Sequence, residues 1–408
     1  MKFVIDSFKD INIKDAPLLL FALYPLFFSE KRGVLVGILL VSALVLLFKG
    51  KQIKVRRGLI INSAIYFVYL ISFLLLSSDK STFKVFETGA SLIIFPFVFL
   101  VYFYNYKEIL SQRIEIKFFS IFYWSCFVYS LIGFLYVFFS YLKNSNEPFH
   151  FFINQLNNKI PIVYDHPIYS SMLLGIAILF MAKRIIVDMK NTHIFQWISL
   201  ILIVLFLFFL SRKGVIIAAV FSTLFLFKEK FLKNGILLAL FTALLIFIIP
   251  STRKRMYSLF NQESYVEKNE TNSTNNRINI YKCAIKKIKE KPFLGYGIND
   301  DKKALYNCYK ENLYYLNENK FNTHNQYLSV LMKSGIIGLI IFMFMLVYNL
   351  RMAVITNDRL FLVLLIYFTA IMMFENILER QNGVMIFSFI INYFAFKSLQ
   401  KNDLYNET

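Results

Sequence analysis

Cysteine is the first residue type that this sequence nearly lacks, with only three in 408 residues. So few thiols exclude a small scaffold built on disulfides. Cys126 lies in an apolar run, whereas Cys283 and Cys308 share one polar segment. Those two could pair if the segment faces an oxidising compartment, and two unrelated thiols are an equal alternative.

Residues that bind metals or cofactors are equally scarce. The four histidines form no H-E-x-x-H pattern, the cysteines form no closely spaced pair, and Asp300–Asp301 is the one acidic cluster expected outside. Gly295-Tyr-Gly297 is far too short for a dinucleotide-binding loop. We therefore expect no metal and no other cofactor.

Apolar residues dominate instead: they make up 57% of the chain and include 47 phenylalanines. They come in blocks near the roughly 20 residues that cross a bilayer as a helix. The sequence therefore predicts an all-α, polytopic membrane protein. No cleavable signal peptide is expected, because residues 1–15 are polar and no small-residue cleavage site follows. About twelve spans are predicted, at residues 15–29, 33–49, 58–77, 84–105, 117–141, 167–186, 194–210, 214–228, 234–250, 325–348, 359–375 and 383–397.

Basic residues outnumber acidic ones by 45 to 25, which gives a formal net charge of +20. They flank the apolar runs, a pattern typical of membrane orientation and headgroup binding rather than of nucleic-acid binding. If the N-terminus is cytoplasmic, the inside connections hold more than twice as many Lys and Arg residues as the short outside connections. The bias places both termini in the cytoplasm.

One outside segment is long enough for a small subdomain. Within it, residues 277–290 and 301–317 carry apolar side chains at helical spacing, and Asn276 is the expected N-cap of the first helix. We predict two amphipathic helices over the outer mouth of the bundle. The chain thus divides into three parts: nine spans at residues 1–250, the outer loop at 251–324 and three further spans at 325–408.

Arginines at two outside positions are candidates for anion binding. Arg212 and Lys213 occupy a hairpin of about four residues between two spans, against the orientation bias. Both side chains could simply reach the headgroups, or they could form an anion clamp, since guanidinium groups bind phosphate oxygens with two parallel hydrogen bonds. Arg277 opens the first loop helix, where a bound anion or plain solvent are the alternatives.

His324 stands at the outer end of a span, where a neutral imidazole can accept a proton. A loop histidine bonded to backbone is the alternative. Ser334, Gly335 and Gly338 follow it, and we interpret them as a small-residue face that lets another helix approach closely. His166 precedes Pro167 on the same outer side, where a helix-start role competes with a role in substrate binding.

Together these residues resemble a known family. The sequence SRKG follows one span, R-x-x-x-Y links Arg277 to Tyr281 and KPFLGYG follows it within the outer loop, and His324-Asn325 is followed after nine residues by G-x-x-G. This pattern resembles the O-antigen ligase and polymerase superfamily. Many relatives carry an acidic residue near Lys333, so this chain departs from the common pattern there.

The resemblance implies a GT-C-like glycosyltransferase of the bacterial inner membrane with a periplasmic active site. Its donor would be a glycan linked to undecaprenyl diphosphate, and its acceptor lipid A–core or another glycan, with membrane lipids around it. Arg212 and Arg277 would hold the diphosphate, His324 would be the general base, and Lys213, Tyr281, Asn325 and His166 would help to bind substrate. No metal is implied.

Other functions remain open at this stage. Within the family, an O-antigen ligase, a polymerase of repeat units and a protein O-oligosaccharyltransferase share these features, and we favour the ligase. A flippase or transporter for lipid-linked sugars would also need many spans. It would more often show internal repeats, which this sequence does not show.

Overall fold

The computed structural model describes residues 12–50, 52–78, 83–143, 151–152, 156, 163, 165–187, 193–227, 231–257, 273–310 and 313–407. In this part of the chain every regular element is a helix. The elements, in order, are α2 (Ala16–Phe21), η1 (Tyr24–Leu26), α3 (Arg32–Lys49), α4 (Arg57–Leu76), α5 (Lys84–Gly89), α6 (Ser91–Asn105), η2 (Lys107–Leu110), α7 (Gln112–Lys143), α9 (Pro167–Val187), α10 (Ile194–Leu210), α11 (Lys213–Leu224), α12 (Phe231–Ile248), α13 (Pro250–Tyr257), α15 (Ser273–Glu290), α16 (Asp300–Tyr309), α17 (Tyr314–Glu318), α18 (Gln326–Ile355), α19 (Arg359–Met372), η4 (Ile377–Glu379) and α20 (Gln381–Glu407).

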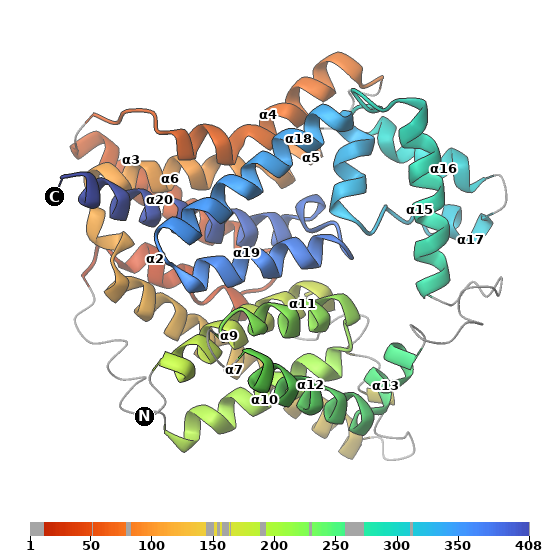
Figure 1. The fold of residues 1–408 in the computed structure, drawn as a ribbon, viewed down its shortest axis with the longest axis horizontal. Coiled ribbons are helices and arrows are strands. Elements are labelled where there is room, and N and C mark those ends of the chain that lie inside the picture. Colours follow the sequence, from red (N-terminus) through yellow and green to blue (C-terminus); the bar gives the residue numbers. More distant parts are fainter. Residues whose placement is uncertain are drawn as a thin grey trace.

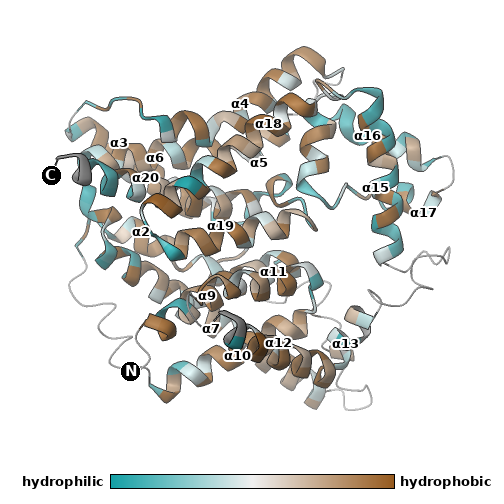
Figure 2. Ribbon diagram, viewed as in Figure 1, coloured by the Kyte–Doolittle hydropathy of each residue, from teal (hydrophilic) through white to brown (hydrophobic). Residues whose placement is uncertain are grey.

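The long helices run side by side as one bundle, and α15, α16 and α17 cover one end of it (Figure 1). The C-terminal end of α20 lies at the opposite end. Apolar residues cover the bundle helices, whereas polar residues gather on α15–α17 and at the helix ends (Figure 2). An apolar belt between two polar ends is the surface that a lipid bilayer requires.

Among the described residues, seven helices are long and apolar enough to cross a membrane: Arg32–Lys49, Arg57–Leu76, Lys84–Asn105, Gln112–Lys143, Pro167–Val187, Gln326–Ile355 and Gln381–Asp403. The multi-pass helical architecture is thereby confirmed. Four further predicted spans correspond to shorter apolar helices, namely Ile194–Leu210, Lys213–Leu224, Gly235–Ile248 and Arg359–Met372. A total of twelve crossings stays a prediction.

The predicted first span at residues 15–29 is wrong as a single membrane-crossing helix. The six residues of α2 and the short η1 replace it. Its two ends nevertheless contact opposite ends of the bundle: Asp15 accepts a hydrogen bond from Tyr106 at 2.8 Å, and Arg32 pairs with Asp165 at 2.7 Å. The segment therefore leads from one end of the bundle toward the other without a continuous spanning helix.

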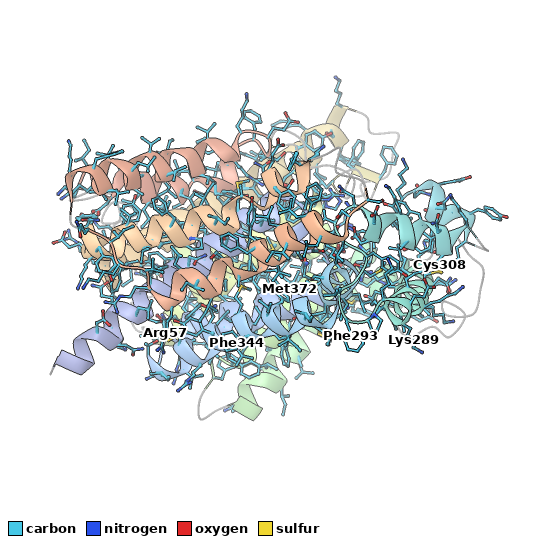
Figure 3. The ribbon with its side chains drawn as sticks, turned by 90° about the horizontal axis from the view of Figure 1, so that it is seen from above. Arg57, Lys289, Phe293, Cys308, Phe344 and Met372 are labelled. Atoms are coloured by element: carbon cyan, nitrogen blue, oxygen red, sulfur yellow. A yellow bond between two sulfur atoms is a disulfide. The ribbon has the colours of Figure 1, made fainter. Side chains whose placement is uncertain are left out.

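Two short helices leave a recess below the outer subdomain. The 12 residues of α11 and the 14 residues of α19 rise only about 18 and 21 Å, against a hydrocarbon core of about 30 Å. The two helices pack against each other. Figure 3 places Met372, the last residue of α19, between Phe344 within α18 and Phe293 nearer the outer subdomain. Residues that follow α19 or precede α11 thus lie inside the bundle end.

The described residues of the predicted outer segment 251–324 include most of α13 and three further helices, α15, α16 and α17, rather than the two helices predicted. Helices α15–α17 form the outer subdomain. Its first helix, α15, begins at Ser273, so Asn276 lies within the helix and is not its N-cap, and Arg277 lies beyond the first turn. The predicted helix at 301–317 is divided into α16 and α17. A disulfide joins Cys283 to Cys308, which settles the pairing that the sequence left open. It ties α15 to α16 over their shared apolar contacts.

Helix α18 is broken near its outer end at Gly335, whose φ of 59° is not helical. Such a break leaves backbone groups of the helix unpaired, and buried groups of this kind need partners. The loop at residues 292–297 supplies them: Tyr296 N–H donates to the Met332 carbonyl at 2.8 Å, and Ile336 N–H donates to the Pro292 carbonyl at 2.8 Å. The KPFLGYG loop therefore supplies hydrogen-bond partners for backbone groups that the break leaves unpaired.

The small residues of α18 have two different neighbours. A Cβ atom on Gly335 would overlap the backbone of Phe293 and Leu294, so a loop, and not a helix, approaches it. A Cβ atom on Gly338 would lie 3.3 Å from Val68 of α4, which is the helix contact that the sequence predicts. The predicted helix-packing face is thus correct at Gly338 and wrong at Gly335.

Substitution of Gly335 by alanine tests the requirement for this break. A left-handed backbone and overlap with Phe293 together predict a loss of about 1–3 kcal/mol in the free energy of unfolding. Gly37→Ala on α3 is the control, because nothing lies within 4 Å of its added Cβ atom. Thermal unfolding of the detergent-purified variants measures both, and equal midpoints for the two variants would contradict the interpretation.

Candidate active site

His324 lies in a turn directly before α18, and the local sequence fixes its position. Asn325 is the N-cap of α18, with its side chain accepting hydrogen bonds from the N–H groups of Tyr327 and Leu328. His324 itself has a φ of 43°, and its N–H donates to the Asn322 side chain at 3.0 Å. A non-glycine residue in the left-handed region is uncommon, and such residues concentrate at functional sites.

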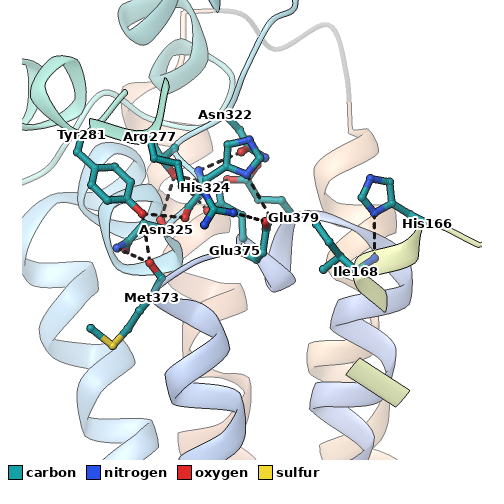
Figure 4. Close-up of polar contacts among 12 residues, drawn as sticks. His166, Ile168, Arg277, Tyr281, Asn322, His324, Asn325, Met373, Glu375 and Glu379 are labelled. Atoms are coloured by element: carbon teal, nitrogen blue, oxygen red, sulfur yellow. Dashed lines mark hydrogen bonds and ion pairs between the residues drawn. The ribbon is translucent and has the colours of Figure 1, made fainter. Parts of the chain in front are cut away.

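One carboxylate gathers two of the predicted site residues (Figure 4). Glu375, which follows α19, accepts a hydrogen bond from Arg277 Nη2 through Oε1 at 2.9 Å. Its other oxygen, Oε2, lies 3.2 Å from His324 Nδ1. Three segments that are distant in sequence therefore meet at this carboxylate: α15, the turn before α18 and the connection after α19.

Glu375 remains ionised at neutral pH. Burial acts to raise its pKa, but the hydrogen bond with His324 and the charges of His324 and Arg277 outweigh burial. The more distant charge of Arg212 acts in the same direction, so the net pKa of Glu375 is lowered. An ionised carboxylate only accepts hydrogen bonds, so His324 Nδ1 carries the proton that it donates. In the neutral ring Nε2 is then free to accept a proton.

Tyr281 and Asn325 brace the same turn. The Tyr281 hydroxyl lies 3.3 Å from the carbonyl oxygens of both His324 and Met373. Burial raises its pKa, so the phenol stays protonated and donates. Asn325 Nδ2 also donates to the Met373 carbonyl, at 3.1 Å. These two predicted site residues thus position His324 and Glu375 through the backbone.

Arg212 and Lys213 lie at the recessed start of α11, as the predicted hairpin requires. Ser211 ends α10 with a φ of 51°, and α11 begins two residues later. Lys213 Nζ lies 3.4 Å from the hydroxyl of Thr274 on α15. Gly214 makes the approach possible, since a Cβ atom there would come within 2.7 Å of the Phe374 side chain, next to Glu375.

His166 is not hydrogen-bonded to the cluster around Glu375, although the charges of Arg212 and Glu375 also act on it. Its Nδ1 accepts from the Ile168 N–H at 3.4 Å, a helix-start role at α9 (Figure 4). Burial, followed by the charges of Arg380 and Arg212, lowers its pKa to about 4. The ring is therefore neutral at pH 7, and its Nε2–H is a potential donor to a ligand.

A second ion pair lies near the His324 cluster and is linked to it by hydrogen bonds. Lys333 Nζ contacts Glu379 Oε1 at 2.7 Å, and both side chains are largely buried. Asn376 donates to the same oxygen at 3.0 Å and is also bonded to Thr323, the neighbour of His324. The acidic partner of this pair stands on η4 and the basic partner on α18. Lys333 thus has a structural partner.

Sequence reasoning missed Glu375 and Glu379, and treated Arg380 only as a charge in a connection. The segment FENILER places these three charged residues within six positions. Glu375 was assigned to the end of the predicted span 359–375, whereas α19 ends at Met372. Two carboxylates four residues apart in a short outside connection were the available signal.

The gathered groups favour an anionic ligand and a proton transfer. Arg277 and Arg212 act on the Glu375 carboxylate. Lys213 contacts Thr274 on the helix that carries Arg277, and the charge of Arg380 acts, with that of Arg212, on His166. Fixed cations in a poorly hydrated recess stabilise a developing negative charge strongly. The imidazole of His324, oriented by Glu375, can accept a proton beside them.

Comparison with known proteins gives one finding. Residues 197–343 match the family model described as O-antigen ligase. The matched segment includes Arg212, Arg277 and His324, and it ends eight residues beyond the break in α18 at Gly335. No curated protein matches the chain. The resemblance stated from the motifs is thus confirmed, and it rests on the same stretch of sequence.

Gly214→Ala tests how closely α11 must approach the connection that carries Glu375. Overlap with Phe374 predicts a loss of about 1–3 kcal/mol in the free energy of unfolding. The nearest obstructing atom is the Cβ of Phe374, so removing the whole side chain in Gly214→Ala/Phe374→Gly should recover part of that loss, relative to Phe374→Gly alone. A double-mutant cycle on thermal unfolding measures this coupling, and strictly additive effects would contradict the proposed contact.

Proposed function

We propose, from the match of residues 197–343 to the O-antigen ligase family model, that this protein is a membrane glycosyltransferase. It transfers a glycan from an undecaprenyl diphosphate carrier to an acceptor hydroxyl on the periplasmic side of the inner membrane. The acceptor is lipid A–core, which makes the protein an O-antigen ligase. The observation that carries the proposal is the carboxylate of Glu375, which holds Arg277 and His324 at one recessed point.

Two observations support a periplasmic site with cytoplasmic termini. The disulfide between Cys283 and Cys308 lies in the subdomain beside the site, and disulfides persist in oxidising compartments such as the periplasm. The end of the bundle away from this subdomain carries the C-terminal part of α20. The distribution of Lys and Arg residues assigns that end to the cytoplasm.

The arginines have a defined role in this reaction. As the bond between the anomeric carbon and the diphosphate oxygen breaks, negative charge develops on the leaving group. Arg277 uses one guanidinium nitrogen for Glu375, which leaves further N–H donors for phosphate oxygens. Arg212 and Lys213 approach the same recess from α11. The proposal assigns charge neutralisation to these side chains rather than to a metal ion.

His324 acts as the general base. A sugar hydroxyl is a poor nucleophile, and a positioned base contributes about 10²–10⁴-fold to the rate. His324 Nε2 takes the hydroxyl proton while the hydroxyl oxygen bonds to the anomeric carbon from the face opposite the diphosphate. The configuration at that carbon is therefore inverted. Glu375 stabilises the imidazolium that forms.

The identity of the acceptor separates the ligase from its alternatives. A polymerase would use a second lipid-linked repeat unit, and a protein O-oligosaccharyltransferase would use a Ser or Thr side chain. Deletion of the chromosomal gene followed by a lipopolysaccharide gel distinguishes them. Core without glycan indicates a ligase, core with one repeat unit indicates a polymerase, and an unchanged ladder indicates a different glycan or a protein acceptor.

His324→Ala and Arg277→Ala should each reduce glycan transfer by about 10²-fold or more, because they remove the base and a leaving-group cation. The gel from strains carrying each allele, with membrane protein levels matched by immunoblot, measures the effect. Lys289→Ala is the matched control, an exposed residue on the same helix as Arg277 (Figure 3). Normal surface polysaccharide in the His324→Ala strain would refute the assignment.

Glu375→Gln should lower kcat while leaving KM values nearly unchanged, because Glu375 is a positioning residue. Its two oxygens accept from Arg277 and His324 at once, and an amide has only one oxygen. With that oxygen on Arg277, the amide N–H faces His324 Nδ1 and selects the tautomer whose Nε2 is already protonated. We expect a loss of about 10²-fold or more in kcat.

The control for this variant is Glu290→Gln, which neutralises a carboxylate at the exposed end of α15. Steady-state transfer by purified enzyme, with donor and acceptor varied separately, gives both constants. An increase in KM with kcat unchanged would assign Glu375 to substrate binding instead.

A further inference from the structure

A cavity of about 200 Å³ lies beside the site but outside the His324 cluster. Tyr69 of α4, Gly89 of α5, Asp301 of α16 and Glu379 of η4 all line it. Lys333 of α18 completes its inner wall. None of the three residues that meet at the Glu375 carboxylate is part of the lining, so the cavity is a separate space.

One buried polar atom among the lining residues has no hydrogen-bond partner. It is Oδ1 of Asp301, a residue that is only 5% exposed. Buried polar groups are nearly always paired in native structures, and leaving one unpaired costs free energy. An unpaired carboxylate oxygen on a residue in the wall of a cavity favours a polar occupant.

The rest of the lining favours a sugar over water alone. Water would satisfy the polar atom, but it gains nothing from the aromatic rings of Tyr66, Tyr69 and Phe86, which share the same wall. A pyranose ring presents C–H groups on its faces and hydroxyls on its rim. Aromatic rings and buried polar groups together match both parts.

The size of the cavity agrees with a single ring. A cavity of roughly 150 Å³ accommodates a benzene ring, so about 200 Å³ admits one six-membered sugar and not two. The lining also carries Lys84 and Lys302, with Asn299 at the start of α16. These donors suit hydroxyls or a carboxylate substituent on the ring.

A short chain of contacts joins the cavity to the reaction centre. Glu379 lines the cavity and binds Lys333, while Asn376 links Glu379 to Thr323. Thr323 precedes His324 in the turn before α18. A sugar held in the cavity is therefore adjacent to the recess in which the glycosidic bond would form.

We propose that this cavity is a subsite for one pyranose ring of the transferred glycan or of its acceptor, next to the sugar that reacts. The inference rests on the proposed glycosyl transfer, and it adds a site at which the enzyme would select its substrate by one sugar ring. Asp301 binds ring hydroxyls, and Tyr66 and Phe86 pack on the ring face.

The protonation of Asp301 agrees with such a role. Burial raises its pKa to about 6, against the opposing effect of the charge on Lys333. Near neutral pH both forms of this carboxyl group are accessible. It can then accept a hydrogen bond from a hydroxyl or donate one to it.

Two variants test the subsite by different means. Gly89→Leu fills the cavity: a Cβ atom at Gly89 meets only the Tyr66 ring, at 3.6 Å, so a larger side chain extends into the open space. Asp301→Asn keeps the shape of the side chain and removes its charge. Gly37→Leu is the size-matched control, on an open surface of α3 where nothing lies within 4 Å.

The substrates come from a strain that lacks this gene, where unused donor and acceptor accumulate. They are the carrier-linked glycan and the lipid A–core extracted from those cells. Transfer by purified enzyme is measured with each substrate varied in turn. Gel filtration establishes whether each variant is folded. If one variant does not fold, the other alone tests the subsite.

We expect an increase of about tenfold in one KM, with kcat within about twofold of the unsubstituted enzyme. An increase for the carrier-linked glycan assigns the ring to the donor, and an increase for lipid A–core assigns it to the acceptor. Unchanged KM values, or a loss confined to kcat, overturn the subsite. Inactivity of the unsubstituted enzyme overturns the proposed function, and the subsite with it.

Discussion

The buried carboxylate of Glu375 is the interaction on which the arrangement of the site depends. An ionised carboxylate in a poorly hydrated recess requires cationic partners, and removing one of them leaves an uncompensated charge. Arg277 supplies the compensating charge, and the neutral ring of His324 supplies an N–H donor from a different segment. Pairing of Glu375 therefore helps to hold the outer subdomain, the turn before α18 and the end of α19 together.

The recess in turn depends on the lengths of the helices around it. Because α11 and α19 are short, their outer ends, and the polar residues attached to those ends, lie below the rim of the bundle. Gly214 permits α11 to approach the connection after α19 closely at that depth. The break in α18 has a related effect, since it gives the loop at 292–297 a fixed place against the bundle. Backbone geometry thus positions the charges before any substrate is bound.

The helices were largely predictable from sequence, because apolar runs report burial in lipid or in the bundle directly. Arg212, Arg277 and His324 were predictable because they belong to motifs with fixed spacing. Glu375 was not, since hydropathy assigned it to the end of a span that stops three residues earlier. The break at Gly335 was not predictable either. It lies in an apolar stretch whose composition is that of a continuous helix, and its cause is a loop some 40 residues away.

The order of the broken helix and its complement along the chain has a consequence for biogenesis. The loop at 292–297 is synthesised before α18, so its hydrogen-bonding groups have already left the ribosome when α18 enters the translocon. The outer turn of α18, with Lys333 and its open backbone groups, is unsuited to lipid on its own. We therefore expect lateral release of α18 into the bilayer to require docking against the loop at residues 292–297, so that this part of the candidate site forms only when α18 inserts.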